Sequence, residues 1–528
     1  MTNRSVTDRS MPDRSMTEET RTLRGDRRRS AAAGLSAAVV AVGLAELVAA
    51  VVEPSASPFA VIGSGLIDLA PSWAKDAAIA LFGTGDKLAL ITGIAIVLDG
   101  VAALAGILER RRAGVGATIL AALGVLALVA AMIRPGAGPF AWLPGLVAGA
   151  VAVVALRLLV RRLSPVPYLR PDAEERRRFL LWTVGVAATG VVALVVGNAA
   201  RGATRSIDAV RTALRLPAPT TPAPAVAASA ELGVPGLASV VTSNADFYRI
   251  DTALIVPRLD PADWTLRIHG MVEREVRITW DELLALPMQE SYVTLACVSN
   301  EVGGDLIGNA RWLGHPVREL LAKAGIDPDA DMVLSRSSDG FTASTPIEAL
   351  TDDRDALLAV AMNGEPLPIE HGFPVRMVVP GLYGYVSATK WVTELEVTRF
   401  DRATAYWTDR GWSERGPVKL QSRIDVPRPG QRIDAGDAVI AGMAWQQHVG
   451  IEGVEVRIDE GPWSRAELST PISPDTWVQW RLPWAAESGM HTVECRALSA
   501  DGETQTSEPA GVVPDGAQGW HRIQVSVA

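Results

Sequence analysis

Five long apolar runs within the first 200 residues constrain this chain more than any other feature. Each run is about 20 residues long, the length that a helix needs to cross the hydrocarbon core of a bilayer. Backbone groups in that core have no water to bind, so the runs are expected to be helices. They lie at 34–52, 88–108, 114–133, 140–160 and 179–199. Residues 31–200 are therefore predicted to form an all-α transmembrane bundle of about five helices.

A further apolar stretch at 58–82 is interrupted by charged residues and a proline, which predicts an interfacial or extracytoplasmic helix pair instead of a sixth span. Arginines gather before the first run, after the second and after the fourth, whereas the alternate loops hold only Lys75, Lys87 and Arg134. Because cytoplasmic loops carry the excess of Lys and Arg, the N-terminus is expected in the cytoplasm. An odd number of spans then places the C-terminal region outside the cytoplasm.

The segments that flank the bundle carry further signals. Residues 1–30 are rich in Arg, Ser, Thr and Asp without periodicity and are predicted to be a disordered cytoplasmic tail. The fifth run is preceded by Arg176, Arg177 and Arg178, followed by Phe-Leu. This pattern is similar to the twin-arginine signal, which exports folded, cofactor-loaded domains. A plain positively charged anchor is the alternative interpretation.

Two carboxylates, Glu46 and Asp99, fall inside the proposed spans. A carboxylate in the hydrocarbon core is costly, so each is a candidate functional group. The alternative is that the carboxylate is hydrogen-bonded inside the bundle or lies near the end of a span.

No histidine precedes His269. A haem held by two imidazoles is therefore excluded from the bundle, and no haem is expected in this chain.

The remainder of the chain has the composition of a soluble protein and carries all six histidines. The net charge of −9 leaves no concentrated basic face, so nucleic acid is not expected as a partner. Residues 201–240 are rich in Pro, Thr and Ala and are predicted to be an extended, semi-rigid linker.

Residues 241–405 mix short β-rich runs with helices. An acidic start and a closing proline predict a helix at 281–287, and a second helix is expected at 317–324, ending at Gly325. Residues 375–380 are typical of a buried strand. Because strands and helices do not alternate regularly, the predicted fold is α+β.

From residue 416 to residue 528 the pattern changes to short strand-like runs separated by turn residues, which predicts a β-sandwich of immunoglobulin type. The runs lie at 438–444, 454–458, 477–482 and 492–498. Alternation in the last run places Val493, Cys495 and Ala497 on one face. Cys495 is therefore expected to be a buried and chemically quiet thiol.

The second cysteine, Cys297, ends an apolar run and opens a polar, Gly-rich loop in the sequence TLACVSNEVGG at 294–304. A thiolate at such a junction can serve as a metal ligand or a nucleophile, and an inert thiol is equally compatible with these residues. A cysteine protease is disfavoured because the loop lacks an obvious base. A structural zinc site is disfavoured because no second cysteine lies nearby.

Six segments together resemble the sulfite oxidase family. They are TLACVSNEVGG at 294–304, RWLG at 311–314, MNGEPLP at 362–368, HGFPVR at 371–376, VPGLYG at 379–384 and SATKW at 387–391. The resemblance covers about 240–400 as a pterin-binding domain and 416–528 as an immunoglobulin-like dimerisation domain. It implies a molybdenum–molybdopterin cofactor, a membrane-anchored bacterial form, and a homodimer through the C-terminal domain.

The resemblance also implies roles for individual residues. Cys297 would be the protein thiolate on molybdenum, a metal that suits a soft sulfur ligand. His371 and Arg376 would contact the pterin and its phosphate. The remaining implied contacts are Lys390 with Ser387 and Thr389 at the phosphate end, Tyr248 and Arg249 on the other side of the cofactor, and Ser337, Arg336 and Thr342 as further candidates.

Departures from the family pattern bear on the substrate. Sulfite-oxidising members follow the cysteine with arginines, but these places hold Glu301 and Val302. Phe341 stands where those members have a tyrosine after Asp-Gly. A carboxylate near the reacting oxygen would repel sulfite, so Glu301 is a candidate catalytic residue for another substrate. The acidic loop is closer to the periplasmic methionine-sulfoxide reductase branch, which lacks the sandwich domain. His315 is expected to be a solvated loop residue.

The resulting expectation is a membrane-anchored molybdopterin oxidoreductase that transfers an oxygen atom to or from a small substrate outside the cytoplasm. Electrons would pass to a separate electron-transfer protein or to a quinone. The alternatives are sulfite oxidase proper, a sulfoxide or N-oxide reductase acting on proteins or small molecules, and a cofactor-free membrane-anchored assembly module.

Overall fold

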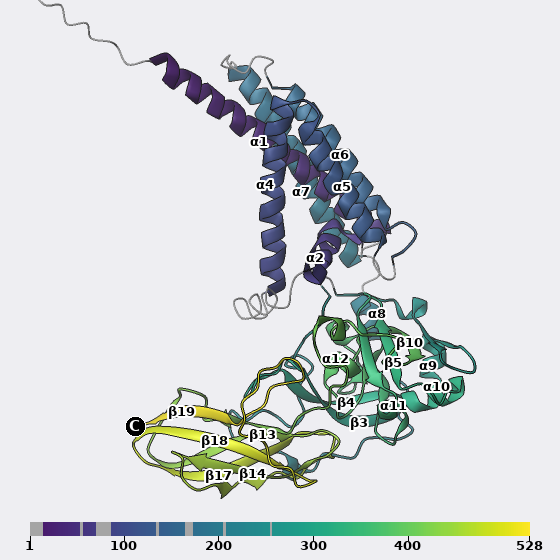
Figure 1. Ribbon diagram of the computed structural model, residues 1–528, viewed down its shortest axis with the longest axis vertical. Coiled ribbons are helices and arrows are strands. Elements are labelled where there is room, and N and C mark those ends of the chain that lie inside the picture. Colours follow the sequence, from purple (N-terminus) through teal and green to yellow (C-terminus); the bar gives the residue numbers. More distant parts are fainter. Residues whose placement is uncertain are drawn as a thin grey trace, which may run out of the picture. The chain divides into compact units, whose positions relative to one another are not determined.

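The computed structural model describes residues 14–52, 56–69, 86–133, 137–163, 173–203, 207–253 and 256–528. The chain divides into two compact units, one formed mainly by residues up to Ser206 and the other by residues from Ile207 to Ala528. The first unit is helical, and the second contains all the strands that the structure describes (Figure 1).

Five helices of the first unit are long and apolar enough to cross a membrane, judged by length and composition. They are α1 (Arg14–Val52), α4 (Asp86–Arg111), α5 (Val115–Met132), α6 (Trp142–Arg161) and α7 (Ala173–Ala203). Each contains one of the five predicted runs almost completely, so the predicted all-α bundle is confirmed. The stretch at 58–82 contributes α2 (Pro58–Leu69), which is only 12 residues long. The part of this stretch from residue 70 lies outside the described residues.

Glycines set the closest approaches inside the bundle. A Cβ on Gly43 of α1 would lie 2.0 Å from the carbonyl oxygen of Gly190 in α7, and a Cβ on Gly190 would lie 2.4 Å from the carbonyl oxygen of Val39. Gly124 of α5 and Gly149 of α6 approach one another in the same way. Small residues let two helix backbones approach closely. Membrane helices pack in this way, because no hydrophobic effect drives them together in the bilayer.

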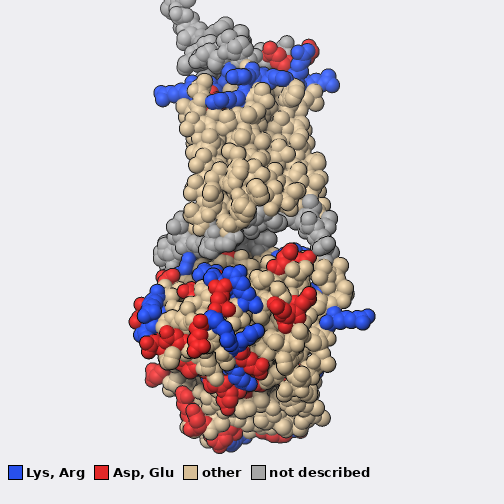
Figure 2. All heavy atoms as spheres, turned by 90° about the vertical axis from the view of Figure 1, so that its right-hand side faces the viewer, with Lys and Arg blue, Asp and Glu red and all other residues tan. Residues whose placement is uncertain are grey.

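Lys and Arg side chains gather at one end of the bundle, and the apolar surface below them is nearly free of charge (Figure 2). Arg110 and Arg111 lie in the last turn of α4, and Arg161 lies in the last turn of α6. Glu46 is buried inside the bundle and accepts a hydrogen bond from the Ser57 hydroxyl at 2.7 Å. Asp99, in contrast, is exposed on α4.

Two expectations for the flanking segments need correction. Helix α1 begins at Arg14, so the predicted disorder of 1–30 is wrong from that residue onward. The apolar run supplies the costly helix nucleus, after which each added Arg, Glu or Leu extends the helix at little cost. The linker at 201–240 is largely extended, as predicted, but it includes the helix α8 (Ile207–Ala213) and is not a free spacer.

The linker runs along the second unit and is fixed to it by hydrogen bonds. The N–H of Thr220 donates to the carbonyl of Met288 at 2.7 Å, and the N–H of Leu232 donates to Gln479 Oε1 at 2.7 Å. Leu214, Leu216 and Val226 pack against the main core. These apolar residues between the prolines explain why the linker is held in place.

The α+β domain is built from two sheets. The first has the order β2-β1-β10-β5-β6 and the second has the order β3-β4-β7-β8, with β9 paired to β7. The strands of the first sheet are β1 (Thr265–Gly270), β2 (Val276–Thr279), β5 (Met332–Ser337), β6 (Thr342–Pro346) and β10 (Val392–Thr398). Those of the second are β3 (Gln289–Ala296), β4 (Ile307–Pro316), β7 (Leu357–Met362), β8 (Glu365–Pro366) and β9 (Arg376–Val378). Among the described strands of these two sheets, only β1 and β10 pair in parallel, so the α+β prediction is confirmed.

Local signals position the helices of this domain. Helix α9 (Trp280–Leu284) begins at a capping box of Thr279 and Glu282, which satisfies the first free N–H groups. Helix α10 (Val317–Ala324) ends at Gly325, whose φ of 71° is in the left-handed region. Both predicted helices are thus confirmed. The domain also contains α11 (Glu348–Thr351) and α12 (Gly384–Ser387).

His315 does not occupy the predicted solvated loop. Strand β4 extends through this residue, which is 2% exposed, and its Nδ1 lies 2.8 Å from the carbonyl oxygen of Pro287. The Gly and Pro on either side of His315 indicated a turn, but the pairing of β4 with β7 overrides that local preference.

The C-terminal strands form the predicted two-sheet sandwich. One sheet has the order β11-β13-β17-β16 and the other β12-β19-β18-β14-β15. The strands are β11 (Gln421–Val426), β12 (Arg432–Ile433), β13 (Gly436–Trp445), β14 (Ile451–Ile458), β15 (Ser464–Arg465), β16 (Glu467–Leu468), β17 (Val478–Ala486), β18 (Gly489–Ser499) and β19 (His521–Val527). Cys495 is fully buried between Val493 and Ala497 in the core of the sandwich, and burial raises the pKa of its thiol to about 12. Its prediction as a quiet core thiol is confirmed.

The glycine contacts predict a difference between two alanine variants of α7. Gly190→Ala forces α1 and α7 apart and should lower the free energy of unfolding of the bundle by about 1–3 kcal/mol. Gly185→Ala is the matched control, because a Cβ there meets no atom within 4 Å. It should leave stability unchanged or raise it by up to about 1 kcal/mol. Thermal unfolding in detergent, followed by helical circular dichroism, measures both; equal melting temperatures would contradict this packing.

Candidate active site

A cavity in the second unit brings together five of the predicted site residues. It has a volume of about 130 Å³. Cys297, Tyr248, Ser337, Arg376 and Lys390 line it, and they come from five separate places in the sequence. Both sheets of the α+β domain therefore contribute to the cavity.

Cys297 follows directly after β3, at the junction that the sequence predicted. Its N–H donates to the carbonyl of Leu306, and its carbonyl accepts from the N–H of Asn300, so the loop folds back on the thiol. The residue is 9% exposed. Burial raises the pKa of the thiol, while hydrogen bonds from Ser299 act in the opposite direction. A bound metal ion would be needed to hold this buried sulfur as a thiolate.

The strand that leads to Cys297 is fixed by the sandwich. Thr294 donates its N–H to the carbonyl of Asp475 at 3.0 Å, and its carbonyl accepts from Gln447 Nε2 at 3.1 Å. Its hydroxyl accepts from the N–H of Trp477 at 2.9 Å. Beyond Cys297, Arg423 of the sandwich donates to the carbonyl of Gly304 at 2.8 Å. The sandwich thus holds the segment on both sides of the thiol.

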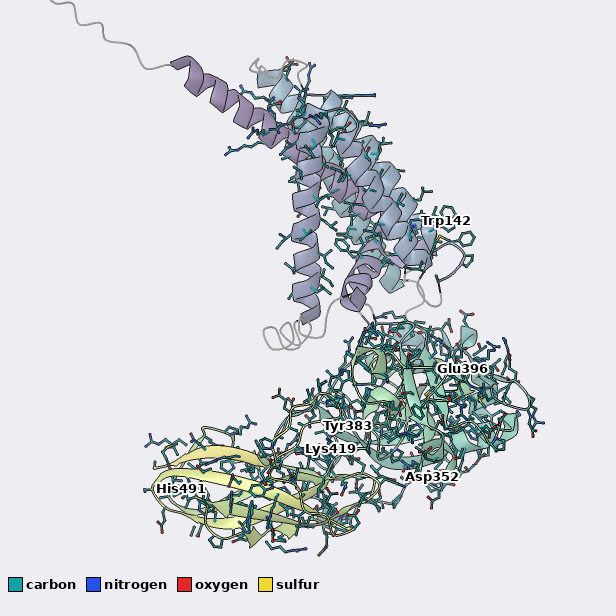
Figure 3. All side chains as sticks on the ribbon, in the orientation of Figure 1. Trp142, Asp352, Tyr383, Glu396, Lys419 and His491 are labelled. Carbon is teal, nitrogen blue, oxygen red and sulfur yellow. The ribbon has the colours of Figure 1, made fainter. Side chains whose placement is uncertain are left out.

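A second contact between the domains lies at Tyr383 and Lys419, which Figure 3 places where the α+β domain meets the sandwich. The N–H of Lys419 lies within 3.4 Å of the Tyr383 hydroxyl, and its ammonium binds Asp515 at 2.9 Å. Burial raises the pKa of Tyr383 to about 12, and the nearby Cys297 sulfur acts in the same direction. Tyr383 therefore stays protonated close to the cavity.

Arg376 is a buried cation without an anionic partner among the described residues. Its guanidinium donates to the carbonyls of His371, Met377 and Ala388 at 3.1–3.4 Å and lies over the ring of Trp312. The residue is 4% exposed, and burial lowers its pKa to about 10. A buried charge that is not compensated costs several kcal/mol, roughly 3–5 when a partner is lost. An anionic ligand in the cavity would remove that cost.

Lys390 lines the cavity, and the buried His371 lies near Lys390 and Arg376 without lining it. The Lys390 ammonium donates to Asp251 at 3.2 Å and to the carbonyl of Glu370 at 2.9 Å, and burial lowers its pKa to about 8. His371 is 2% exposed, and its Nδ1 is buried without a hydrogen-bond partner in the described part of the chain. Burial and the neighbouring Lys390 lower the pKa of His371 to about 3. A neutral imidazole with an unpartnered nitrogen is free to bind a cofactor.

These observations fit an anionic, pterin-type cofactor. The cavity is lined by the Cys297 thiol, by the cations Arg376 and Lys390 and by aromatic rings. The unpartnered imidazole of His371 lies beside it. Phosphate is bound in proteins by the same charged donors. The donor set therefore matches a molybdopterin with the metal at Cys297 and the phosphate at the cations.

The other predicted residues do not all reach the cavity. Ser387 and Thr389 are fully buried, and their hydroxyls bond inside the protein, Thr389 to Ser335 at 2.7 Å. Arg249 points to Asp251 at 3.0 Å with its side chain 42% exposed. Arg336 pairs with Glu394, and the Thr342 hydroxyl accepts from the N–H of Tyr406. Glu301 is exposed on the loop and does not line the cavity, so the geometry gives it no contact with the reacting centre.

Sequence reasoning missed several residues that line the cavity. They are Phe247, Ile250, Asp251, Asp339, Tyr385, Trp407 and Trp412. Two tryptophans within the segment between the predicted domains were a usable signal, because a connecting segment rarely needs such large apolar side chains. Asp251 carried no such signal, since its role follows only from its contact with Lys390.

Comparison with known proteins agrees with this site. A profile of the oxidoreductase molybdopterin binding domain matches residues 253–407. Mitochondrial sulfite oxidase of Macaca fascicularis is 29% identical over 343 residues, which cover 54% of this chain and 62% of that protein. The uncharacterized oxidoreductase YuiH of Bacillus subtilis is 32% identical over 157 residues, which cover 30% of this chain and 76% of YuiH.

A solved structure, the sulfane dehydrogenase SoxCD from Paracoccus pantotrophus, aligns with a TM-score of 0.48 and 24% identity, covering 55% of this chain and 85% of that one. The fold, the cavity and the matched domain define a molybdopterin-binding oxidoreductase. The chain belongs to the sulfite oxidase family. It spans 62% of the length of the macaque sulfite oxidase, which is less than two thirds of that protein.

The lowered pKa of Lys390 predicts how stability changes with pH in protein made without the cofactor. The folded state releases this proton near pH 8, whereas the unfolded chain keeps it until about pH 10.5, so the unfolded state binds more protons between these values. Lys390 alone should therefore contribute a rise of about 2 kcal/mol in the free energy of unfolding from pH 8 to pH 10. The buried thiol of Cys495 and the hydroxyl of Tyr383, whose pKa values are raised, contribute in the opposite direction. Denaturant unfolding of variants that differ at Lys390 isolates its contribution.

Lys390→Met should lose this contribution, because it removes the titrating amine. Lys323→Met, at an exposed position of α10, is the control and should keep it. Equal slopes in the two variants would show that Lys390 is not the titrating group.

Proposed function

We propose that this chain is a membrane-anchored molybdopterin oxidoreductase that catalyses two-electron oxygen-atom transfer on a small substrate outside the cytoplasm. The observation that carries the proposal is the cavity in which Cys297 lies with the buried cations Arg376 and Lys390. The molybdenum cofactor, when bound, supplies the redox chemistry. Cys297 supplies the soft thiolate ligand, and the fold around it fixes the direction of that sulfur.

The remaining residues bind and orient the cofactor. Arg376 and His371 bind its polar groups, and Lys390 binds the phosphate with a charge-assisted hydrogen bond. Tyr248 and Ser337 contact it from other sides of the cavity. The residues whose side chains bond inside the protein, Ser387, Thr389 and Arg249, act as positioning residues instead of direct ligands.

The anchor is formed by the five apolar helices. Their Lys and Arg side chains gather at one end (Figure 2), which supports a cytoplasmic location of that end. Helix α7 begins at the same end with Arg176, Arg177 and Arg178, so the chain that follows it emerges on the other side. Export by the twin-arginine route would let the domain fold and load its cofactor before it crosses the membrane.

Electrons are exchanged with a separate electron-transfer protein or with a quinone in the membrane. The sandwich, besides holding the Cys297 segment, forms a homodimer in this proposal. The relatives named sulfite oxidase favour that activity as a second candidate. The exposed Glu301 and the half-buried Val302 argue against it, because they occupy the places where the family's sulfite-oxidising members carry arginines.

Metal analysis of Cys297→Ser tests the proposal. Purified wild-type protein from a host that makes the cofactor should contain about one molybdenum per chain. The variant should lose oxygen-atom-transfer activity by a factor of about 1,000 or more, because the metal loses its protein ligand. Cys495→Ala is the matched control, since this thiol lies in the sandwich core, and it should keep both metal and activity.

A wild-type protein free of molybdenum and pterin would instead indicate the cofactor-free assembly module. Full activity in Cys297→Ser would remove the proposed site while leaving the membrane anchor untouched.

A further inference from the structure

Four buried residues from four separate parts of the chain form a closed ring of hydrogen bonds on the strand that leads to Cys297. They are Thr294 in β3, Asn309 in β4, Trp477 of the sandwich and Val240, the last residue of the linker. Each of the four is at most 3% exposed. Water therefore does not compete for these bonds.

Both ends of the Asn309 amide take part in the ring. The Thr294 hydroxyl donates to Asn309 Oδ1 at 3.1 Å, and Asn309 Nδ2 donates to the Val240 carbonyl at 2.7 Å. The same carbonyl accepts from Trp477 Nε1 at 2.8 Å, and the Trp477 N–H donates back to the Thr294 hydroxyl at 2.9 Å. The hydroxyl oxygen can accept from Trp477 because its own proton points to Asn309. Each group in the ring thus has a definite role as donor or acceptor.

The Val240 carbonyl is fixed because the linker is bound on both sides of it. The Val240 N–H donates to Glu231 Oε1 at 2.6 Å, and the other oxygen of that carboxylate accepts from Gln479 Nε2 at 2.7 Å. Two residues beyond Val240, the Thr242 N–H donates to the Asn309 carbonyl at 2.7 Å, and the Thr242 hydroxyl accepts the Asn309 N–H at 3.1 Å. The end of the linker is therefore packed into the ring from both directions.

A change in the ring reaches Cys297 through a short and rigid path. Thr294 lies directly opposite Asn309 in the pairing of β3 with β4. Leu295 and Ala296, the two residues between the strand position and the thiol's own residue, are each 1% exposed. If one member of the ring is lost, its neighbours keep buried polar groups without partners, so the ring opens as a unit. The end of β3 then loses the bonds that set the direction of the sulfur.

We propose that Asn309 is a positioning residue for Cys297, and that the linker shares in this positioning through the Val240 carbonyl. The inference rests on the proposed function, in which the Cys297 sulfur binds the metal, and it names the groups that orient this ligand. Hydrogen bonds behind a metal ligand set its orientation, and their loss lowers metal affinity or activity by about 10- to 100-fold. The linker is thus a component of the active-site scaffold as well as a connection between the two units.

Alkylation of Cys297 in full-length protein made without the cofactor tests the inference. Iodoacetamide should react with Cys297 at least about tenfold faster in Asn309→Leu than in the wild type, because the end of β3 opens more often. Mass spectrometry of the peptides separates this reaction from that of Cys495, which is fully buried.

Gln505→Leu is the matched control, because the same chemistry recurs there inside the sandwich. Gln505 Oε1 accepts from the Ser422 hydroxyl at 2.9 Å, and its Nε2 donates to the Gly519 carbonyl at 2.8 Å. This variant loses a buried amide of the same kind and should have a lower melting temperature. It should leave the alkylation rate of Cys297 at the wild-type value.

Two further comparisons test the hydroxyl and the linker separately. Thr294→Val removes the hydroxyl and should accelerate the alkylation, whereas Thr294→Ser keeps the hydroxyl and should restore the wild-type rate. Glu231→Ala frees the linker without altering the ring residues and should also accelerate the alkylation. An unchanged rate in Glu231→Ala would overturn the role of the linker.

Electron paramagnetic resonance of the molybdenum-loaded protein, poised at an intermediate potential, gives a second readout. The signal depends on the direction of the sulfur ligand, so it should shift in Asn309→Leu and stay unchanged in Gln505→Leu. Wild-type alkylation rates in both Asn309→Leu and Thr294→Val would overturn the inference, because the ring would then only stabilise the fold. If Asn309→Leu does not fold, the two Thr294 variants decide the question.

The alkylation needs no metal, so the inference and the proposed function can fail separately. Unchanged rates in protein that does bind molybdenum would reject the inference alone. Faster alkylation of the ring variants, in a protein that binds no molybdenum in a cofactor-making host, would reject the proposed function and keep the ring as the device that positions the thiol.

Discussion

The position of the Cys297 thiol depends on the hydrogen bonds of Thr294, three residues earlier in the chain. Its N–H, its carbonyl and its hydroxyl all bond to residues of the sandwich, at Asp475, Gln447 and Trp477. The bonds are made at a residue that is only 2% exposed, so the end of β3 cannot shift without leaving buried polar groups unpaired. The sandwich is therefore part of the active-site scaffold, whatever further role it has in assembly.

Around this fixed sulfur the cavity has two chemically different sides. Arg376 and Lys390 form a polar side that fits an anionic cofactor. Phe341, Trp407 and Trp412 form an apolar side.

The sequence predicted those parts of the molecule whose cause is local. Runs of apolar residues predicted the five long helices. The proline and the glycine that end α9 and α10 predicted those two helices. An apolar run followed by a Gly-rich loop correctly placed Cys297 at the end of a strand. Parts that depend on distant contacts were missed. His315 is buried because β4 pairs with β7, and the site contains Trp412 because the segment before the sandwich folds back over α12. Glu301 does not line the cavity although it is close to Cys297 in the sequence, and its catalytic role stays a prediction.

The central claim is that the Cys297 sulfur binds the metal directly. X-ray absorption at the molybdenum edge of purified protein tests it, because sulfur and oxygen neighbours of the metal scatter differently. The account predicts that Cys297→Ser loses one sulfur neighbour of molybdenum relative to the wild type, and that Cys495→Ala loses none. An unchanged sulfur shell in Cys297→Ser would contradict it.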